Sequence, residues 1–340
     1  MLPTPLLNTA VAINATACFL IGITLNTMLL WLILKRSPAS LRTYSRVLLQ
    51  SAVTNMVCLT ATVLYSPVQL ASAKGSLTYG VGWLVRADND IDGTRTWNFT
   101  LHSVWVYTVF FSQLSVIVFF LFRYFAVCHG RMLTGLEYGM ILTVAAVAAS
   151  FYLPYYFFCG ANYVVPSPAL LAELGLLHST ATNFSEAIAS LVLPNTMSAV
   201  YVTAQASICG ASYFIVIACN VAIYCHLRRA LTSSQVGISH IQGRQINFIL
   251  LIDAVVPFVF DFLPTYVVTA MAQLLRGQVT PQTPTAVLMV VVWAPVVNAA
   301  SVILVVRPYR RAVLGAKVGS ENTRAVNTVS SANNNGILLR

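Results

Sequence analysis

The chain has 340 residues, of which 58% are hydrophobic and only 8% are charged, and its formal net charge is +10. Soluble domains carry about 25% charged residues, so this composition excludes an ordinary soluble protein. The basic residues lie in short stretches between long apolar segments, which favours contact with anionic lipid over binding of nucleic acid.

Seven apolar segments are each long enough to cross a membrane, because a spanning helix needs about 20 residues. In chain order we expect spans at about 10–34, 47–72, 101–127, 139–158, 200–225, 247–273 and 285–306. No Lys or Arg precedes the first segment, and it is too long for the core of a signal peptide. It is therefore expected to be retained as an anchor.

The Lys and Arg residues fall mainly on one side of these spans. With the N-terminus outside, 15 of the 19 lie in cytoplasmic segments, and the opposite orientation would break the positive-inside rule. We therefore predict an all-α bundle of seven transmembrane helices over residues 1–306, with an extracellular N-terminus and a cytoplasmic C-terminus. Residues 307–318 are expected to lie on the inner membrane surface, and residues 319–340 to form a disordered tail.

The segment 169–194 is apolar enough to be weighed as an eighth span. Its two Glu and one His residues are costly at membrane depth, and it contains a glycosylation sequon starting at Asn183. We interpret it as a long second outer loop, glycosylated at Asn183. A second sequon starts at Asn98 in the first outer loop, whereas the sequon at Asn14 falls within the first span and is expected to be silent.

Seven spans with an outer N-terminus are the topology of G-protein-coupled receptors, although some channels and transporters share it. Residues at helix ends and breaks sharpen the choice. They are Gly22 and Asn26 in the first span, Asn55 in the second, Phe122-Arg123-Tyr124 at the inner end of the third, Pro257 and Pro264 in the sixth, and Pro295, Asn298 and Arg307-Pro308-Tyr309-Arg310-Arg311 in the seventh.

At these positions the chain resembles the nematode serpentine chemoreceptors, most closely class D (Srd) of the Str superfamily. The strings that carry the resemblance are LILKRSPASLRTYSRVLLQ (32–50), FFLFRYFAVC (119–128) and VVRPYRR (305–311). The resemblance covers the whole membrane region. It implies a plasma-membrane receptor of sensory cilia that needs no cofactor, binds a small chemical cue and activates a heterotrimeric G protein.

Receptor residues can be carried over to matching positions of this chain. Those expected to contact the G protein are Arg123, Tyr124, Arg228, Arg229 and Arg244, and those expected to switch conformation are Arg123, Asp253, Phe262, Pro264 and Asn298. Arg123 lies roughly 7 Å inside its span and Asp253 roughly 9 Å inside the sixth, at 1.5 Å per residue. We expect the two to pair at rest; alternatively Arg123 snorkels to the headgroups and Asp253 is protonated or bonds a hydroxyl.

A ligand pocket is expected between the outer halves of spans 3, 5, 6 and 7, as in other helix bundles. Its candidate lining residues are His102, Trp105, Gln113, Tyr201, Gln205, Asp261 and Tyr266. For the aromatic residues, packing in the core or at the lipid interface is the alternative. Asp261 either binds a cationic ligand or stays neutral and hydrogen-bonded.

Enzymatic functions find little support, because the five His residues lack metal-ligand spacing and no Gly-x-Ser-x-Gly motif occurs. An opsin is excluded, since a retinal Schiff base needs an intramembrane Lys, and all three Lys residues lie outside the spans. A transporter or channel is the alternative to a receptor. Asp253 and Asp261 could both face the bundle interior and relay an ion or a proton.

Overall fold

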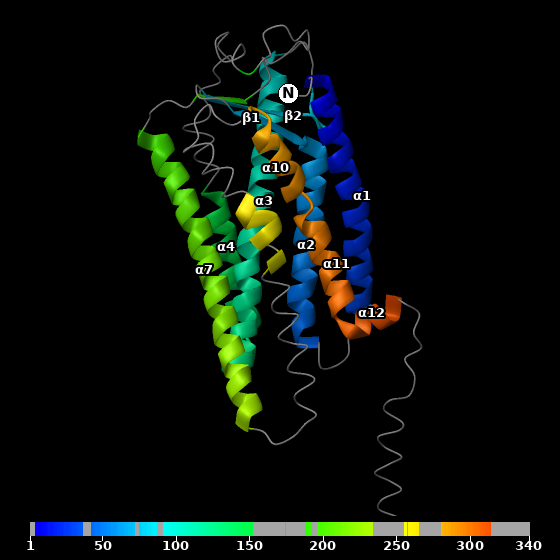
Figure 1. The fold of residues 1–340 in the computed structure, drawn as a ribbon, viewed down its shortest axis with the longest axis vertical. Coiled ribbons are helices and arrows are strands. Elements are labelled where there is room, and N and C mark those ends of the chain that lie inside the picture. The colour runs from blue at the N-terminus through cyan, green and yellow to red at the C-terminus, as the bar shows by residue number, and fades with distance from the viewer. Residues whose placement is uncertain are drawn as a thin grey trace, which may run out of the picture.

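The computed structural model describes residues 4–36, 42–71, 75–86, 91–151, 174, 188–191, 196–233, 255–256, 258–264 and 280–313. Within these ranges the chain forms a bundle of long helices with one small sheet at one end (Figure 1). Four helical stretches are long and apolar enough to span a membrane, at 4–36, 45–65, 96–128 and 283–305. Two shorter apolar helices cover 135–150 and 210–226.

The helices are α1 (Thr4–Arg36), α2 (Arg42–Tyr65), α3 (Ile91–Cys128), α4 (Gly135–Ser150), α7 (Thr196–Ser233), α10 (Thr283–Val291), α11 (Ala294–Val305) and α12 (Arg307–Val313). Helix α3 contacts α2, α4 and α7, and α1 contacts α2 and α11. The strands lie at the same end as the N-terminus, and α12 lies at the opposite end (Figure 1). We call these the sheet end and the α12 end.

Close packing of the first two helices depends on a small residue. A Cβ atom at Gly22 of α1 would lie 2.5 Å from Leu59 Cδ1 of α2 and 3.1 Å from Val296 Cγ2 of α11. One turn later the buried Asn26 side chain donates to the Gly22 carbonyl at 2.8 Å and accepts from the Asn55 amide at 3.4 Å. The small residue and the amide thus hold α1 against α2.

Helix α4 begins with a complete capping box. The Thr134 hydroxyl accepts from the Glu137 N–H, and the Glu137 carboxylate accepts from the Thr134 N–H at 2.9 Å. These bonds satisfy main-chain donors that have no partner within the helix. The Thr134 N–H also lowers the pKa of the Glu137 carboxyl.

The sheet has strand order β1 (Pro67–Ala71), β2 (Gly75–Gly80) and β3 (Ile188–Leu191), with both pairings antiparallel. In the register, Pro67 faces Gly80 and Thr78 faces Ile188. The sheet therefore joins the segment after α2 to the segment before α7, which are more than a hundred residues apart in the chain.

The second span ends earlier than the expected residue 72. Helix α2 stops at Tyr65, Ser66 has a positive φ of 45°, and β1 begins at Pro67. Proline disfavours helical geometry in the residue before it and has no N–H for a helix bond. The apolar stretch after Ser66 is therefore a strand, which adds a small sheet to the predicted all-helical class.

The segment 81–84 lies against the end of α2 and forms hydrogen bonds with its last carbonyls. The N–H groups of Val81, Trp83 and Leu84 donate to the carbonyls of Tyr65, Val63 and Leu64 at 3.1, 3.2 and 3.1 Å. They satisfy the carbonyls left open where a helix ends. Gly82 makes this approach possible, since a Cβ atom there would lie 2.3 Å from the Leu64 carbonyl oxygen.

Other spans also differ from the expected bounds. Helix α3 begins at Ile91, ten residues before the expected 101, and α7 covers 196–233 in place of 200–225. Of the expected sixth span, only 255–256 and 258–264 are described, including a π-helical turn at Phe258–Phe262. The seventh span is divided into α10 and α11, as described below.

Candidate functional site

The sheet end carries a structure that we call the cap, which consists of β1, β2, β3 and residues 81–86. Its edge strand β1 is fastened to the start of α10. The Gln69 N–H donates to the Thr285 hydroxyl at 3.0 Å, and that hydroxyl donates to the Gln69 carbonyl at 2.6 Å. The Ala71 N–H donates to the Pro281 carbonyl at 3.0 Å. The buried Thr285 hydroxyl thus accepts from and donates to the main chain of one β1 residue, as a neighbouring strand would.

The cap is also fastened to α3. The Asn98 side chain accepts from the Arg86 N–H at 3.1 Å and donates to the Arg86 carbonyl at 3.0 Å. The Arg86 guanidinium lies 4.6 Å from the centre of the Trp97 ring, and the Trp97 indole donates to the Leu84 carbonyl at 2.8 Å. Asn98 is 4% exposed, and both ends of its amide are occupied. This placement argues against the predicted glycan at Asn98.

Two predicted ligand residues lie close together below the cap. His102 and Trp105 of α3 are buried, and their rings lie 5.1 and 6.0 Å from the ring of Tyr65. This arrangement matches the alternative of core packing. The Trp105 indole N–H has no hydrogen-bond acceptor among the described residues.

The remaining ligand candidates are not brought together by the described residues. Gln113 is buried deeper in α3, beside the cavity described next. Tyr201 and Gln205 belong to α7, and Asp261 belongs to the π-helical turn. For these three residues the structure describes the backbone and not the side chain. Tyr266 lies outside the described residues altogether.

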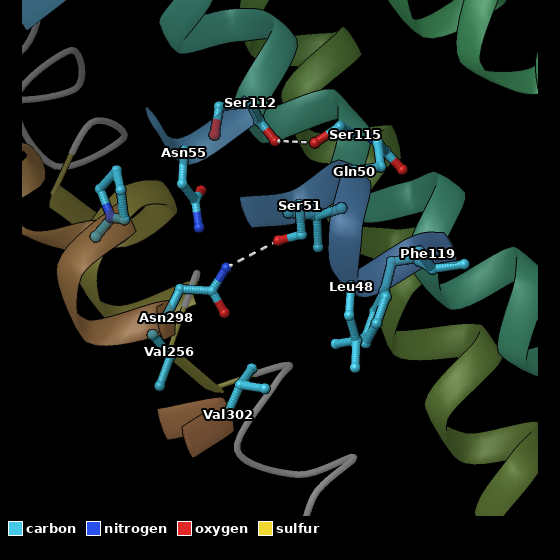
Figure 2. Close-up of a pocket in the computed structure, with 14 residues that line it drawn as sticks. Leu48, Gln50, Ser51, Asn55, Ser112, Ser115, Phe119, Val256, Asn298 and Val302 are labelled. Carbon is cyan, nitrogen blue, oxygen red and sulfur yellow. Dashed lines mark hydrogen bonds between the residues drawn. The ribbon is translucent and has the colours of Figure 1, made fainter. Parts of the chain in front are cut away.

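An uncharged cavity of about 60 Å³ with a mixed polar and apolar lining lies between α2, α3, α11 and Val256, between the middle of the bundle and the α12 end. Figure 2 shows the Asn298 amide of α11 reaching toward the Ser51 hydroxyl of α2, to which it donates at 3.3 Å. The lining residues are Val47, Leu48, Gln50, Ser51, Asn55, Ser112, Ser115, Val116, Phe119, Val256, Ala294, Pro295, Asn298 and Val302.

The lining of this cavity is uncharged and combines polar with apolar side chains. It offers three side-chain amides and three hydroxyls, and its volume suits a few water molecules bonded to these groups. Among the described residues, no group of three His, Cys, Asp or Glu is placed to hold a metal ion. The chemistry available here is hydrogen-bond exchange between helices.

The sequence had indicated Asn55 and Asn298 but not the serines beside them. Ser112 and Ser115 are three residues apart on α3, and the Ser115 hydroxyl donates to the Ser112 carbonyl at 2.8 Å. Ser and Thr commonly bond their own helix in this way, so the pattern carries no signal of a cavity. The role of Ser51 follows only from the position of α11, because its partner Asn298 lies on that helix.

The cavity also connects to α4. The Tyr138 hydroxyl of α4 donates to the Gln50 side chain of α2, and the Tyr138 ring meets Phe122 edge-on at 6.1 Å. Phe122 directly precedes Arg123 in the chain. In this chain that position is aromatic and packs against α4.

Arg123 lies directly beyond the cavity toward the α12 end. It is 8% exposed, and its guanidinium lies 3.9 Å from the centre of the Phe119 ring, which lines the cavity. A cation over an aromatic face is a favourable arrangement where water is excluded. The expected partner Asp253 is outside the described residues, so the pairing remains a prediction.

The other predicted coupling residues lie near this end of the bundle. The Tyr124 hydroxyl contacts the His129 ring nitrogen at 3.2 Å, and Arg228 and Arg229 are exposed on α7. Helix α7 continues past the ends of α2 and α11 here (Figure 1). Arg244 is outside the described residues, as is the Phe262 side chain, whereas Pro264 is half-buried.

Comparison with known proteins decides the class of the molecule. The family described as serpentine type 7TM GPCR chemoreceptor Srd matches residues 11–315. The chain belongs to this family. The resemblance noted in the sequence is thereby confirmed. No curated protein matches the chain.

Solved structures place this Srd chain in the rhodopsin-like fold. The crystal structure of squid rhodopsin is similar with a TM-score of 0.61 and 12% sequence identity, over 93% of this chain and 86% of the rhodopsin chain. At that identity the likeness concerns the fold alone. The Srd chain is a multi-pass membrane protein with the helix bundle of a seven-transmembrane receptor.

The described cysteines of the Srd chain form no disulfide; they are Cys18, Cys58, Cys128, Cys219 and Cys225. Cys159 lies outside the described residues. The described link between the segments after α2 and before α7 is the pairing of β2 with β3.

Proposed function

We propose that this Srd chain is a chemosensory receptor that binds a small chemical cue between its helices near the sheet end and activates a heterotrimeric G protein at the α12 end. The observation that carries the proposal is the family match over residues 11–315, together with the receptor fold. The same match favours a receptor over the alternative of an ion or proton transporter built on Asp253 and Asp261.

The proposal assigns the sheet end to the extracellular side and the α12 end to the cytoplasm. Exposed basic residues support this orientation. Those near the α12 end are Lys35, Arg36, Arg46, Arg131, Arg228, Arg229, Arg310 and Arg311. Cytoplasmic segments of membrane proteins are enriched in such residues. The receptor would lie in the plasma membrane, and in the animal in a sensory cilium.

Protease protection tests this orientation. A C-terminal tag should resist external protease in intact cells and be digested after permeabilisation. A tag removed from intact cells would reverse the assignment.

Two features support ligand binding near the sheet end. The cap covers the bundle there, and the buried Trp105 indole N–H can donate to an acceptor that the described residues do not supply. Buried indole N–H groups normally have a partner. The deeper Gln113 and the side chains of Tyr201, Gln205, Asp261 and Tyr266 complete the proposed set, and Asn183 is the proposed glycan site.

Coupling at the α12 end is supported by Arg123. Its guanidinium lies over the Phe119 ring, and the exposed Arg228 and Arg229 of α7 lie toward the same end of the bundle. A guanidinium has five donors and suits the carbonyls that end an incoming helix. The amides and hydroxyls of the cavity beside Phe119 can exchange hydrogen bonds without moving a charge, which suits a switch between two bundle arrangements.

A screen of small metabolites tests the function. Cells expressing the chain would be exposed to each compound with a calcium or cAMP readout, and cells without the chain would serve as control. A response confined to expressing cells is expected for some compounds. A response that persists when G proteins are inhibited, or that tracks uptake of the compound, would favour transport.

A further inference from the structure

The seventh span is broken at Val292 and Trp293, where α10 ends and α11 begins. Pro295 explains the break, because it has no N–H to offer the Val291 carbonyl and its ring crowds that carbonyl. The Trp293 N–H donates to the Val290 carbonyl at 3.1 Å, three residues back instead of four. The Met289 carbonyl is thereby freed from the regular helix pattern.

One side chain of α1 bonds to both sides of this break. The Asn14 amide donates from Nδ2 to the Met289 carbonyl at 3.1 Å, and its Oδ1 accepts from the Trp293 indole N–H at 3.0 Å. Met289 belongs to α10, and Trp293 is the residue directly before α11. A single amide therefore joins the end of one half-helix to the start of the next.

The surroundings of this contact are apolar. One turn along α1, Cys18 is fully buried in a cluster with Leu59 and Val296, against which Val292 and Trp293 pack. A polar contact among apolar side chains and lipid has no water to replace it if it is lost. The two bonds are therefore well placed to influence the geometry of the break.

The other end of α10 is also fixed, by the contact of Thr285 with the edge of β1. The nine residues of α10 are thus attached to the cap at one end and to Asn14 at the other. Beyond the break, α11 carries Asn298, which lines the cavity of about 60 Å³.

We propose that Asn14 is a positioning residue that fixes the angle between α10 and α11 by bonding both sides of the break in the seventh span. This inference concerns the geometry of the span. It stands apart from the proposed signalling function, since its test needs neither a ligand nor a G protein.

Fluorine NMR of purified receptor labelled with 5-fluorotryptophan tests the proposal. The chain has five Trp residues, and the Trp293 resonance is assigned by Trp293→Phe. Asn14→Ala should shift the Trp293 resonance and leave the other four in place. Asn14→Asp should restore it, because a protonated carboxyl in apolar surroundings offers one O–H and one acceptor, as the amide does.

Asn220→Ala is the matched control, because the Asn220 amide bonds only to the Val216 carbonyl of its own helix at 3.1 Å among the contacts described. It should leave all five resonances unchanged. An unshifted Trp293 resonance in Asn14→Ala would overturn the proposal, as would a general shift of all five that Asn14→Asp fails to correct.

Cys18 provides a second measurement if Asn14→Ala cannot be purified. Trp293→Phe keeps an aromatic side chain, which is smaller than the indole, and removes the indole donor. The looser break should let methyl methanethiosulfonate modify Cys18 roughly two to four times faster. Peptide mass spectrometry of Cys18 gives the rate. An unchanged rate would count against Asn14 as the positioning residue.

Discussion

The two ends of the bundle are held together in different ways. At the sheet end, main-chain bonds join the strands to one another and close the end of α2, side-chain bonds from Thr285 and Asn98 add to them, and Gly82 fits where no side chain could. At the α12 end, helices meet around a cavity of about 60 Å³ through side-chain contacts as long as 3.3 Å. Main-chain bonds fix one register, whereas side-chain contacts can exchange partners. We therefore expect the sheet end to keep its geometry and the α12 end to rearrange more readily.

The largest effect is expected from Arg123→Ala at the α12 end. It should reduce G-protein signalling more than tenfold at unchanged surface expression, because it removes the donors proposed to contact the G protein. Signalling would be measured with a compound found in the screen. Arg131→Ala is the control, since Arg131 is exposed and paired with Glu137. Full signalling by Arg123→Ala would contradict the proposal that Arg123 contacts the G protein at the α12 end.

Gly82→Ala should reduce the stability of the protein, whereas Arg123→Ala should reduce signalling alone. The new Cβ atom would meet the Leu64 carbonyl oxygen at 2.3 Å, and neither main-chain segment can give way. We expect a loss of about 3 kcal/mol and little receptor at the surface. Gly139→Ala is the control, with nothing within 4 Å of the new atom. Equal thermal stability of the two variants would contradict the tight closure of the sheet end.

Thr285→Val tests the attachment of the cap to α10. It keeps the shape of the side chain but removes both bonds to Gln69, which should cost about 1–2 kcal/mol. The melting temperature of purified receptor would be compared with that of Thr283→Val, whose exposed hydroxyl contacts only Thr280 among the described partners. A larger loss in the control would mean that the strand edge is not held by Thr285.

Ser51→Ala applies a similar change at the α12 end. The bond from Asn298 is long at 3.3 Å, so we expect a stability loss below about 0.6 kcal/mol. Comparison with Thr285→Val then sharpens the contrast between the ends. If Ser51→Ala is as damaging as Thr285→Val, the cavity is a rigid part of the fold.

The smallest effect at neutral pH is expected from Tyr79 in the cap. Burial raises its pKa to about 12, and its hydroxyl donates to Asn8 at 2.9 Å. A raised pKa means that the unfolded chain loses this proton first, so stability falls as pH rises from 10 to 12. Tyr79→Phe should flatten that fall in melting temperature. An equally steep fall in melting temperature in Tyr79→Phe would mean that other groups cause the pH dependence.

Hydropathy and charge were sufficient to predict the class. They could not predict β1, because an apolar run after a helix has the same composition whether it continues as helix or begins a strand. Pro67 was the available signal. The site was predicted less well. Asn55 and Asn298 were indicated by the sequence. Ser51 and Gln50 were not, because their partners lie on other helices. Asn14 was interpreted only as a silent sequon, and the sequence did not indicate that it contacts both sides of the seventh-span break.

The pairing of β2 with β3 has a consequence for how such a receptor can vary. Main-chain hydrogen bonds do not depend on which side chains the strands carry, apart from proline and a few glycines. The two loops can therefore change most of their residues and still meet in the same place. A surface held in this way can change its side chains while the frame beneath it stays the same.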